Sequence, residues 1–323
     1  MNILVTGGAG YIGCYIVKEL CQNNNVVIVD NLSTSSIEGI KANPTAKFYE
    51  KDIRNKEEMI KIFSENKIDV VIHMAALLDV EESSRKPLEY YDVNINGTIV
   101  LLEVMKQFDV KNIVFSSTAA VYGNVQEYVK ITEDFLTDPL NNYGYSKLVG
   151  EKILQTISLA EELNYVIFRY FNVAGGKKHG YGIEKMKTLI PRVLSSIKSE
   201  QVLQVYGNDY PSDDGTCVRD YIHVEDLAKA HALAAKKIFN EKNISGIYNL
   251  GSSKGYSVFE VINESGKVIG KAPNFDIVAR RVGDPFYSVA SSEKSEKILG
   301  WQRNYDKLGD IILDMWRENN GQR

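Results

Sequence analysis

The chain has little cysteine, with only Cys14, Cys21 and Cys217 among its 323 residues. Three thiols so widely spaced are too few for a disulfide framework and form no paired metal motif. Isolated thiols of this kind are typical of reducing compartments, which predicts a cytoplasmic protein. The histidines also lack the spacing of metal ligands, so we expect no metal site. They are His73, His179, His223 and His231.

A strong charge of one sign and long apolar runs are also missing. The formal net charge is only -4, which gives no basic surface for nucleic acid or for an anionic membrane. No apolar stretch approaches the length that a bilayer requires. Residues 1–5 have no positively charged segment before them, so we expect no signal peptide. The chain therefore carries no signal for nucleic-acid or membrane partners.

What the chain does have is a regular alternation of short β-rich runs and longer amphipathic segments. The runs are nearly continuous apolar stretches, which are typical of parallel strands buried on both faces. The predicted strands cover residues 3–6, 26–30, 47–50, 70–73, 112–116 and 166–170. The predicted helices between them cover residues 12–22, 56–66, 87–108 and 146–163. This order predicts an α/β fold with a doubly wound parallel sheet.

The pattern changes after Tyr170, where glycines at 175, 176, 180 and 182 predict a connection or an active-site loop. Beyond it, short helices over residues 189–199, 224–239 and 258–266 are mixed with short strands. We predict a first domain over residues 1–172. Residues 173–323 then form a smaller mixed α/β substrate-binding lobe, with some segments returning to the first domain.

A glycine motif marks the first domain as a dinucleotide-binding, or Rossmann, domain. Gly7, Gly10 and Gly13 follow the first predicted strand and open the first predicted helix. Glycines there let the backbone approach a pyrophosphate, which then meets the positive end of the helix. Asp30 ends the second strand, where a carboxylate binds ribose hydroxyls and repels a 2′-phosphate. No arginine follows in residues 31–34, so we predict NAD rather than NADP.

Asp52 and Ile53 follow the third predicted strand and have two interpretations. They could flank the adenine of the cofactor. Alternatively, Asp52 could cap the helix that begins near Asn55. The sequence leaves both open.

Tyr143 and Lys147 lie one helical turn apart and so share a helix face. A phenol acts as a base near neutral pH only if its pKa falls, which a nearby cation can cause. The shift from a pKa of ~10 needs ~4 kcal/mol, about what one cation ~4 Å away supplies at an effective dielectric constant of ~20. Thr118, past the fifth strand, could bond the same substrate hydroxyl. Tyr181 and Lys185 have the same spacing but sit among glycines, outside any amphipathic helix.

Longer motifs give a more specific resemblance, to the extended short-chain dehydrogenase/reductases and, within them, the UDP-glucose 4-epimerases. It runs nearly end to end, and the segments 207–210 (GNDY) and 220–224 (DYIHV) are its most specific parts. Its other markers are residues 7–13, 30–32, 52–55, 87–91, 94–98, 115–123, 143–147, 169–172 and 215–219.

The resemblance implies an enzyme with tightly bound NAD that interconverts UDP-glucose and UDP-galactose. Tyr143 would take the proton of the sugar 4-hydroxyl beside Thr118, and the C4 hydride would pass to NAD and return to the other face. The implied cofactor-binding residues are Gly7, Gly10, Tyr11, Ile12, Gly13, Asp30, Asn31, Leu32, Ser33, Thr34, Asp52, Ile53, Ala75, Asn94, Ser116, Tyr143, Lys147 and Tyr170. Helices near 88–106 and 147–163 resemble those that pair into a homodimer.

The resemblance also implies a UDP-sugar site. Arg219 and Arg281 would pair with phosphate oxygens, because guanidinium makes bidentate contacts. Tyr206 would pack beside uracil, and Asp284 would bind ribose hydroxyls. The implied substrate-binding residues are Thr118, Tyr143, Asn172, Thr188, Leu189, Tyr206, Arg219, Arg281, Asp284 and Ser288.

Three positions depart from the family pattern. Leu78 stands where a lysine usually meets the cofactor phosphates, which predicts a weaker hold on NAD. Thr188 stands where some members have an asparagine beside the diphosphate. Ser288 stands where a bulky tyrosine restricts members to glucose and galactose, so its small size predicts activity on UDP-GlcNAc and UDP-GalNAc.

Other functions remain as alternatives at this point. A sugar-nucleotide dehydratase needs an acid after the active-site threonine, but Ala119 and Ala120 follow Thr118 and have no proton to give. A 4-epimerase of another UDP-sugar, such as UDP-glucuronate, differs only in pocket details. A non-catalytic NAD-sensing regulator would not need Tyr143, Lys147 and Thr118 together.

Overall fold

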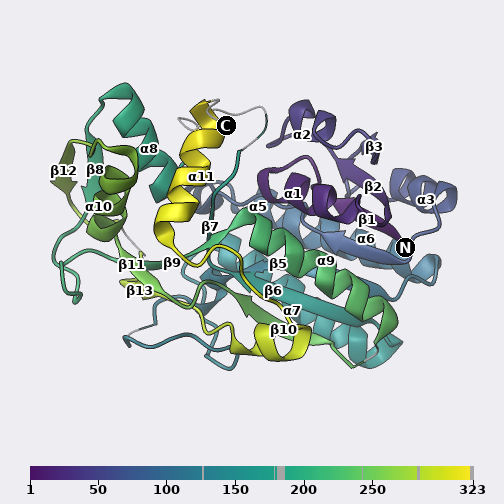
Figure 1. The fold of residues 1–323 in the computed structure, drawn as a ribbon. Coiled ribbons are helices and arrows are strands. Elements are labelled where there is room, and N and C mark those ends of the chain that lie inside the picture. Colours follow the sequence, from purple (N-terminus) through teal and green to yellow (C-terminus); the bar gives the residue numbers. More distant parts are fainter. Residues whose placement is uncertain (126, 178, 180–185, 242, 282–283, 321–323) are drawn as a thin grey trace.

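The computed structural model describes residues 1–323 except 126, 178, 180–185, 242, 282–283 and 321–323. Its centre is a parallel sheet of seven strands in the order β10-β6-β5-β4-β1-β2-β3 (Figure 1). The strands are β1 (Asn2–Thr6), β2 (Asn25–Asp30), β3 (Lys47–Glu50), β4 (Val70–His73), β5 (Asn112–Thr118), β6 (Asn164–Tyr170) and β10 (Gly246–Leu250). The doubly wound α/β fold is therefore confirmed. The strand order reverses between β1 and β4, where such sheets open a crevice for ligands.

Helices cover both faces of this sheet (Figure 1). They are α1 (Tyr11–Leu20), α2 (Ile37–Lys41), α3 (Lys56–Glu65), α4 (Val80–Arg85), α5 (Pro87–Tyr91), α6 (Gly97–Gln107), α7 (Asn142–Glu161) and α9 (Val224–Asn240). The single helix predicted over 87–108 is interrupted by a π-helical segment, Asp92–Asn96, between α5 and α6. Wider turns of this kind often mark functional sites, and this one carries Asn94.

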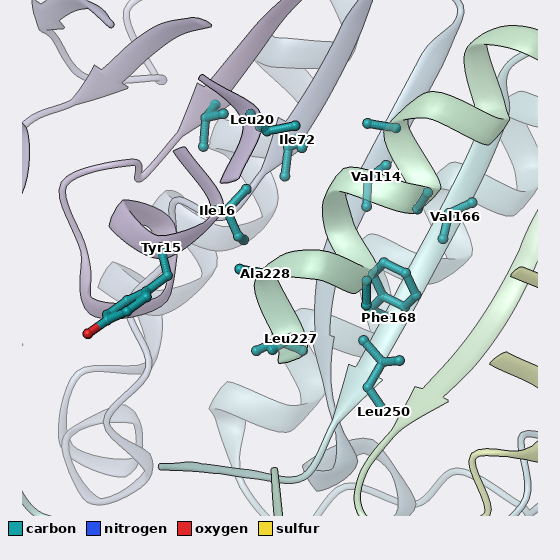
Figure 2. Packing of buried hydrophobic residues seen from close by; sticks show 14 of the residues in the cluster. Tyr15, Ile16, Leu20, Ile72, Val114, Val166, Phe168, Leu227, Ala228 and Leu250 are labelled. Carbon is teal, nitrogen blue, oxygen red and sulfur yellow. The ribbon is translucent and has the colours of Figure 1, made fainter. Parts of the chain in front are cut away.

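One face of the sheet packs against α1 and α9. Ile16 of α1, Leu227 of α9, and Val114 and Phe168 of the sheet belong to one apolar cluster (Figure 2), and all four side chains are essentially inaccessible. Each such side chain contributes roughly 1.5–3 kcal/mol by leaving water. Leu250, at the end of β10, belongs to the same core, so a segment from the second half of the chain completes the first sheet.

The opposite face packs against α3, α6 and α7. The α7 helix approaches β5 closely because it carries Gly150 at the contact: a Cβ there would lie 2.7 Å from Cζ of Phe115. Larger residues would push the helix outward. The close approach matters for function because it brings the buried Lys147, on the same helix face, to the end of β5.

The smaller lobe lies at one end of the molecule (Figure 1). Its helices are α8 (Leu189–Ser199), α10 (Val258–Ile269) and α11 (Leu308–Asn320). Its strands are the pair β8 (Leu203–Tyr206) and β12 (Phe275–Val278), and β7 (Asn172–Ala174), β11 (Gly255–Ser257) and β13 (Tyr287–Ser288) around β9 (Val218–His223). A separate apolar core holds it together, with Leu194 and Ile312 at its centre. Within the described ranges, the structure contains no helix whose length and apolar content would let it cross a membrane.

Candidate active site

A tight turn of glycines joins β1 to α1. Gly7 has a φ of +71°, a conformation that favours glycine. A Cβ at Gly7 would lie 2.7 Å from the backbone nitrogen of Ala75, and one at Gly13 would lie 2.2 Å from the carbonyl oxygen of Gly7. Gly10, the N-cap of α1, offers no side-chain cap. The first N–H groups of the helix therefore remain uncovered by a side chain and suited to an anion.

The glycine turn forms one wall of a pocket at the carboxyl ends of β1, β2 and β4. The predicted cofactor residues that line it are Gly7, Gly10, Asp30, Asn31, Ser33, Thr34, Asp52, Ile53 and Ala75. Tyr11 and Ile12 begin α1, beside the turn, and the Tyr11 hydroxyl donates to the carbonyl oxygen of Gly175. Ser35, Lys51 and Arg54 also line the pocket and were not predicted; Arg54 belongs to the marker segment 52–55, but no role was assigned to it.

Asp30 links the glycine turn to the loop that follows β2. One carboxylate oxygen accepts from the backbone N–H of Ala9 at 3.0 Å. The other accepts from the Leu32 N–H at 2.9 Å and the Ser35 hydroxyl at 2.7 Å. With 8% of its surface exposed, this carboxylate is a fixed negative charge at the edge of the pocket. Its position fits ribose hydroxyls and opposes a 2′-phosphate.

The alternative role of Asp52 as a helix cap is wrong. Asn55 caps α3, by accepting from the Glu58 N–H at 3.2 Å. Asp52 instead accepts from the Arg54 guanidinium at 2.9 and 2.6 Å and from the Asn31 amide at 2.9 Å. Hydrogen bonds from Arg54 hold the pKa of Asp52 down at about 2. The carboxylate is thus ionised and faces the pocket.

Asn94 supports the pocket wall from the π-helical segment. Its side-chain oxygen accepts from the Leu77 N–H at 2.8 Å, and its amide donates to the Leu77 carbonyl at 3.0 Å and to the Ser146 hydroxyl at 2.8 Å. Both amide protons are therefore used within the protein. Asn94 acts on the predicted cofactor site by fixing the loop that follows β4, at Leu77, against α7, and it is 3% exposed.

Tyr143, Lys147 and Thr118 come together at the end of β5. The Lys147 ammonium donates to the carbonyl oxygen of Ser116 at 2.8 Å. The Thr118 side chain lies close enough to Tyr143 to lower the pKa of its phenol, and it accepts from the Ala120 N–H at 3.1 Å. Tyr170, at the end of β6, lies close enough to Tyr143 for their charges to interact. The phenol and the hydroxyl thus interact near the end of β5, where the buried Lys147 amine is also held.

The lowering of the Tyr143 pKa that we predicted from Lys147 is not found in the protein without its cofactor. Burial raises the pKa of Tyr143 to about 12, opposed by the hydrogen bond from Thr118. Burial also lowers the pKa of Lys147 to about 7, opposed by the nearby Glu151 carboxylate. Burial disfavours the phenolate, a cost that the spacing of the two residues does not reveal.

A buried ion pair behind these residues was missed. Glu151 of α7 accepts hydrogen bonds from the Arg169 guanidinium at 2.9, 3.2 and 2.5 Å and from the Ser117 hydroxyl. The side chains of Arg169 and Glu151 are 3% and 1% exposed. The sequence did contain a signal, because Glu151 lies four residues after Lys147 on the same face of one helix.

The predicted substrate residues other than Thr118 and Tyr143 lie on the side of the smaller lobe. Arg219 of β9 forms an ion pair with Asp284 at 2.5 Å. Ser288 of β13 is the strand partner of Arg219, so the predicted specificity residue neighbours a predicted phosphate ligand. The Asn172 amide donates to the Asp220 carbonyl at 3.2 Å.

The first turn of α8 lies in the same lobe. Thr188 is the N-cap of α8, without a side-chain cap bond, and Leu189 opens the helix. Tyr206, predicted to pack beside uracil, has the Arg281 guanidinium 3.9 Å from the centre of its ring. Arg192 of α8 also lies over this ring and was missed, because a single arginine on a helix resembles a surface residue.

Leu78 lines the cofactor pocket and is 66% exposed. The next residue, Asp79, caps α4 by accepting from the Glu82 N–H at 2.9 Å and forms an ion pair with Lys187. The Lys187 ammonium therefore lies beside Asp79, the residue after Leu78, and Leu78 stands where the family pattern has a lysine. The effect of Leu78 on NAD retention stays a prediction.

Among the described residues, no group of three or more His, Cys, Asp or Glu side chains could hold a metal ion. His73 is buried between the Thr6 hydroxyl at 2.7 Å and the Thr98 hydroxyl at 2.9 Å. Tyr181 and Lys185, the second Tyr/Lys pair, lie outside the described residues.

Comparisons with known proteins agree with this geometry. The chain is 45% identical over 321 residues to a UDP-glucose 4-epimerase of Lacticaseibacillus casei, covering 98% of this chain and 96% of that protein. It resembles the UDP-glucose-4-epimerase of Stenotrophomonas maltophila, solved with NAD and formylated UDP-arabinopyranose, with a TM-score of 0.93 and 37% identity over 99% of this chain and 98% of that one. The Bifidobacterium longum enzyme, solved with NAD+ and UDP, gives a TM-score of 0.89 and 40% identity over 100% and 99%.

The resemblance inferred from the sequence is thereby confirmed. A family model described as the NAD dependent epimerase/dehydratase family matches residues 3–251, a span that holds the glycine turn, Asp30, Thr118, Tyr143 and Lys147. The chain therefore belongs to the NAD-dependent epimerase/dehydratase family.

Proposed function

We propose that this protein is a UDP-hexose 4-epimerase that interconverts UDP-glucose and UDP-galactose with tightly held NAD. The observation that carries the proposal is the meeting of Tyr143, Thr118 and Lys147 beside a pocket built for a dinucleotide. The relatives described above act on, or were solved with, UDP-sugars or UDP. The lobe opposite offers Arg219 and Arg281 for the diphosphate.

The side chains have distinct parts in this reaction. The Tyr143 oxygen takes the proton of the sugar 4-hydroxyl, and Thr118 bonds the same hydroxyl and keeps it aligned. NAD, which the glycine turn and Asp30 would hold, would supply the acceptor and donor for the C4 hydride and, when oxidised, a positive charge in addition to that of Lys147. Two positive charges favour the ionised phenol against the cost of its burial. Tyr143 then returns the proton to the carbonyl oxygen, so C4 is inverted and no atom is lost.

The test is incubation of the purified protein with separate UDP-sugars, followed by analysis of C4 stereochemistry by NMR. We expect UDP-glucose and UDP-galactose to reach the same mixture from either side. Exclusive conversion of UDP-glucuronate would move the activity to another 4-epimerase. Absence of turnover by protein that holds NAD would instead favour a regulator.

Ser288 sets the room beside the sugar in this proposal. Its place next to Arg219 in the β9–β13 pair supports that role. We expect Ser288→Tyr to lower kcat/KM for UDP-GlcNAc about tenfold or more while leaving UDP-galactose within about threefold, because a filled pocket rejects the larger sugar. Ser288→Ala is the matched control and should turn over both. Equal loss on both sugars would contradict the assignment.

Gly13 is expected to decide whether NAD is retained. A Cβ in Gly13→Ala would lie 2.2 Å from the Gly7 carbonyl oxygen, so the turn must open and α1 must move. We expect NAD recovered from the purified variant to fall about tenfold or more, measured by absorbance of a protein-free extract. Gly246→Ala is the control, because its nearest neighbour would be 3.5 Å away. Normal NAD content in Gly13→Ala would refute the role of the turn.

We also propose the finer assignments of domains, assembly and compartment. Residues 1–172 would hold NAD and residues 173–323 the UDP-sugar, although α9 and β10 of the latter pack in the first sheet. A homodimer is supported by Leu88 and Leu159, which are 82% and 92% exposed on α5 and α7. Free cysteines, with Cys14 and Cys217 buried, suit the cytoplasm. Analytical ultracentrifugation of the wild type and of Leu159→Glu tests the dimer.

A further inference from the structure

Two guanidinium groups flank one tyrosine ring in the smaller lobe. Arg281, three residues past β12, lies 3.9 Å from the centre of the Tyr206 ring. Arg192, in the first turn of α8, lies 5.3 Å from the same ring. The three side chains come from separate parts of the sequence, and Arg192 is half-buried. The arrangement is therefore made by the fold and is not a feature of one flexible loop.

Among the described residues, neither Arg192 nor Arg281 has a carboxylate partner within ion-pair distance. Arg192 donates to the Gln204 carbonyl at 3.2 Å, a neutral group. The neighbouring arginines differ in this respect. Arg219 pairs with Asp284 at 2.5 Å, and Arg280 pairs with Asp209 at 2.6 Å. Among the described residues, Arg192 and Arg281 thus lack a paired carboxylate, whereas Arg219 and Arg280 each have one.

This excess positive charge is unfavourable without an anion. Burial and the nearby Arg281 both lower the pKa of Arg192, which is the direction expected for a cation that lacks compensation. The pair is connected to the predicted phosphate ligand: the Asp284 N–H donates to the Arg281 carbonyl at 3.4 Å, while the Asp284 carboxylate holds Arg219. Arg281 is therefore linked to Arg192 through the Tyr206 ring and to the Arg219–Asp284 pair through the backbone of Asp284.

We propose that Arg192 binds the diphosphate of the nucleotide sugar together with Arg281, with Tyr206 holding both guanidinium planes in place. The inference rests on the proposed function, which supplies a diphosphate ligand. Guanidinium groups suit this task because they bind phosphate oxygens in a bidentate manner and stack on aromatic rings. The contact assigned to Arg192 is to phosphate oxygens and not to uracil or ribose, which carry no compensating charge.

Calorimetric titration of UDP and of uridine into NAD-containing protein separates the phosphate contact from the base contact. We expect Arg192→Gln to weaken UDP about tenfold to a hundredfold and to leave uridine within about twofold. Arg192→Lys keeps the charge but loses the bidentate geometry, so it should recover part of the UDP affinity. The salt dependence of UDP binding should also be smaller in Arg192→Gln.

Arg280→Gln is the matched control. Arg280 lies 4.2 Å from the centre of the Tyr210 ring and so makes the same kind of stack, but with Asp209 as its acid. We expect UDP affinity within about twofold of wild type. Circular dichroism and NAD content establish that each variant is folded, and Arg192→Lys preserves the test if Arg192→Gln fails that check.

The outcomes distinguish the two proposals. Wild-type UDP affinity in Arg192→Gln overturns the role of Arg192 and leaves the epimerase standing. Equal losses for UDP and uridine also overturn it, because they place the side chain at the nucleoside. Absence of UDP binding by the wild-type protein overturns the proposed function, and this inference with it.

Discussion

Tyr143→Phe is expected to lower kcat about 100- to 10,000-fold, the range that a positioned proton-transfer group contributes. The ring and its packing are kept, so UDP affinity and NAD content should stay close to wild type. The effect follows from the place of Tyr143 beside Thr118, where its phenol is the group assigned to exchange a proton with the sugar hydroxyl. Tyr145→Phe is the matched control, because Tyr145 lies two residues along α7 with 48% of its surface exposed.

The pKa of Tyr143 makes this prediction sharper. At about 12, the phenol is protonated at neutral pH in the protein alone. Ionisation during the reaction must then come from positive charge brought close to it, of which Lys147 is the protein's own source. Lys147→Met should accordingly lower kcat more than it weakens UDP binding. Near-normal turnover in Tyr143→Phe would remove Tyr143 as the base, and equal losses in Tyr145→Phe would show that the helix, and not the hydroxyl, matters.

The central sheet could be predicted from the sequence because β1, β2, β4, β5 and β6 are apolar runs buried on both faces, a pattern visible without tertiary structure. The strands β7, β11 and β13 could not, since they have two or three residues and exist through their pairing with β9. The same limit applies to β10, whose five residues include the polar Asn249. Short strands depend on their neighbours more than on their own composition.

The site divides in the same way. Glycine spacing, Asp30 and the Tyr143/Lys147 pair are local patterns, and the structure brings them together. Arg192 carries no local pattern, because its distinction is the missing acid beside it, which only packing reveals. The pKa of Tyr143 depends on burial, which the sequence does not show either. Asn94 was predicted as a cofactor residue from the family resemblance. Its side chain bonds to Leu77 from the π-helical segment, a placement that the sequence pattern does not reveal.

Glu151→Ala is expected to have the largest effect on stability. It would leave the Arg169 guanidinium, 3% exposed, without a counter-charge inside the protein. Breaking a buried ion pair from one side costs about 3–5 kcal/mol, which corresponds to a fall in Tm of roughly 5–15 °C. Thermal unfolding followed by circular dichroism measures it. Glu161→Ala on the same helix is the control, because its pair with Lys106 at 2.6 Å is exposed and such pairs contribute about 0–1 kcal/mol.

A double variant distinguishes the loss of attraction between Glu151 and Arg169 from the cost of a buried charge that has no partner. Removing both partners in Glu151→Gln with Arg169→Met should cost less than Glu151→Ala alone, because no unpaired charge remains buried. If the double variant is instead the less stable one, the pair itself stabilises the fold. The pair also reaches the chemistry, since the Glu151 carboxylate raises the pKa of Lys147 against the effect of burial. Without the Glu151 carboxylate Lys147 would lose its proton at lower pH, so the pH above which kcat falls should also be lower.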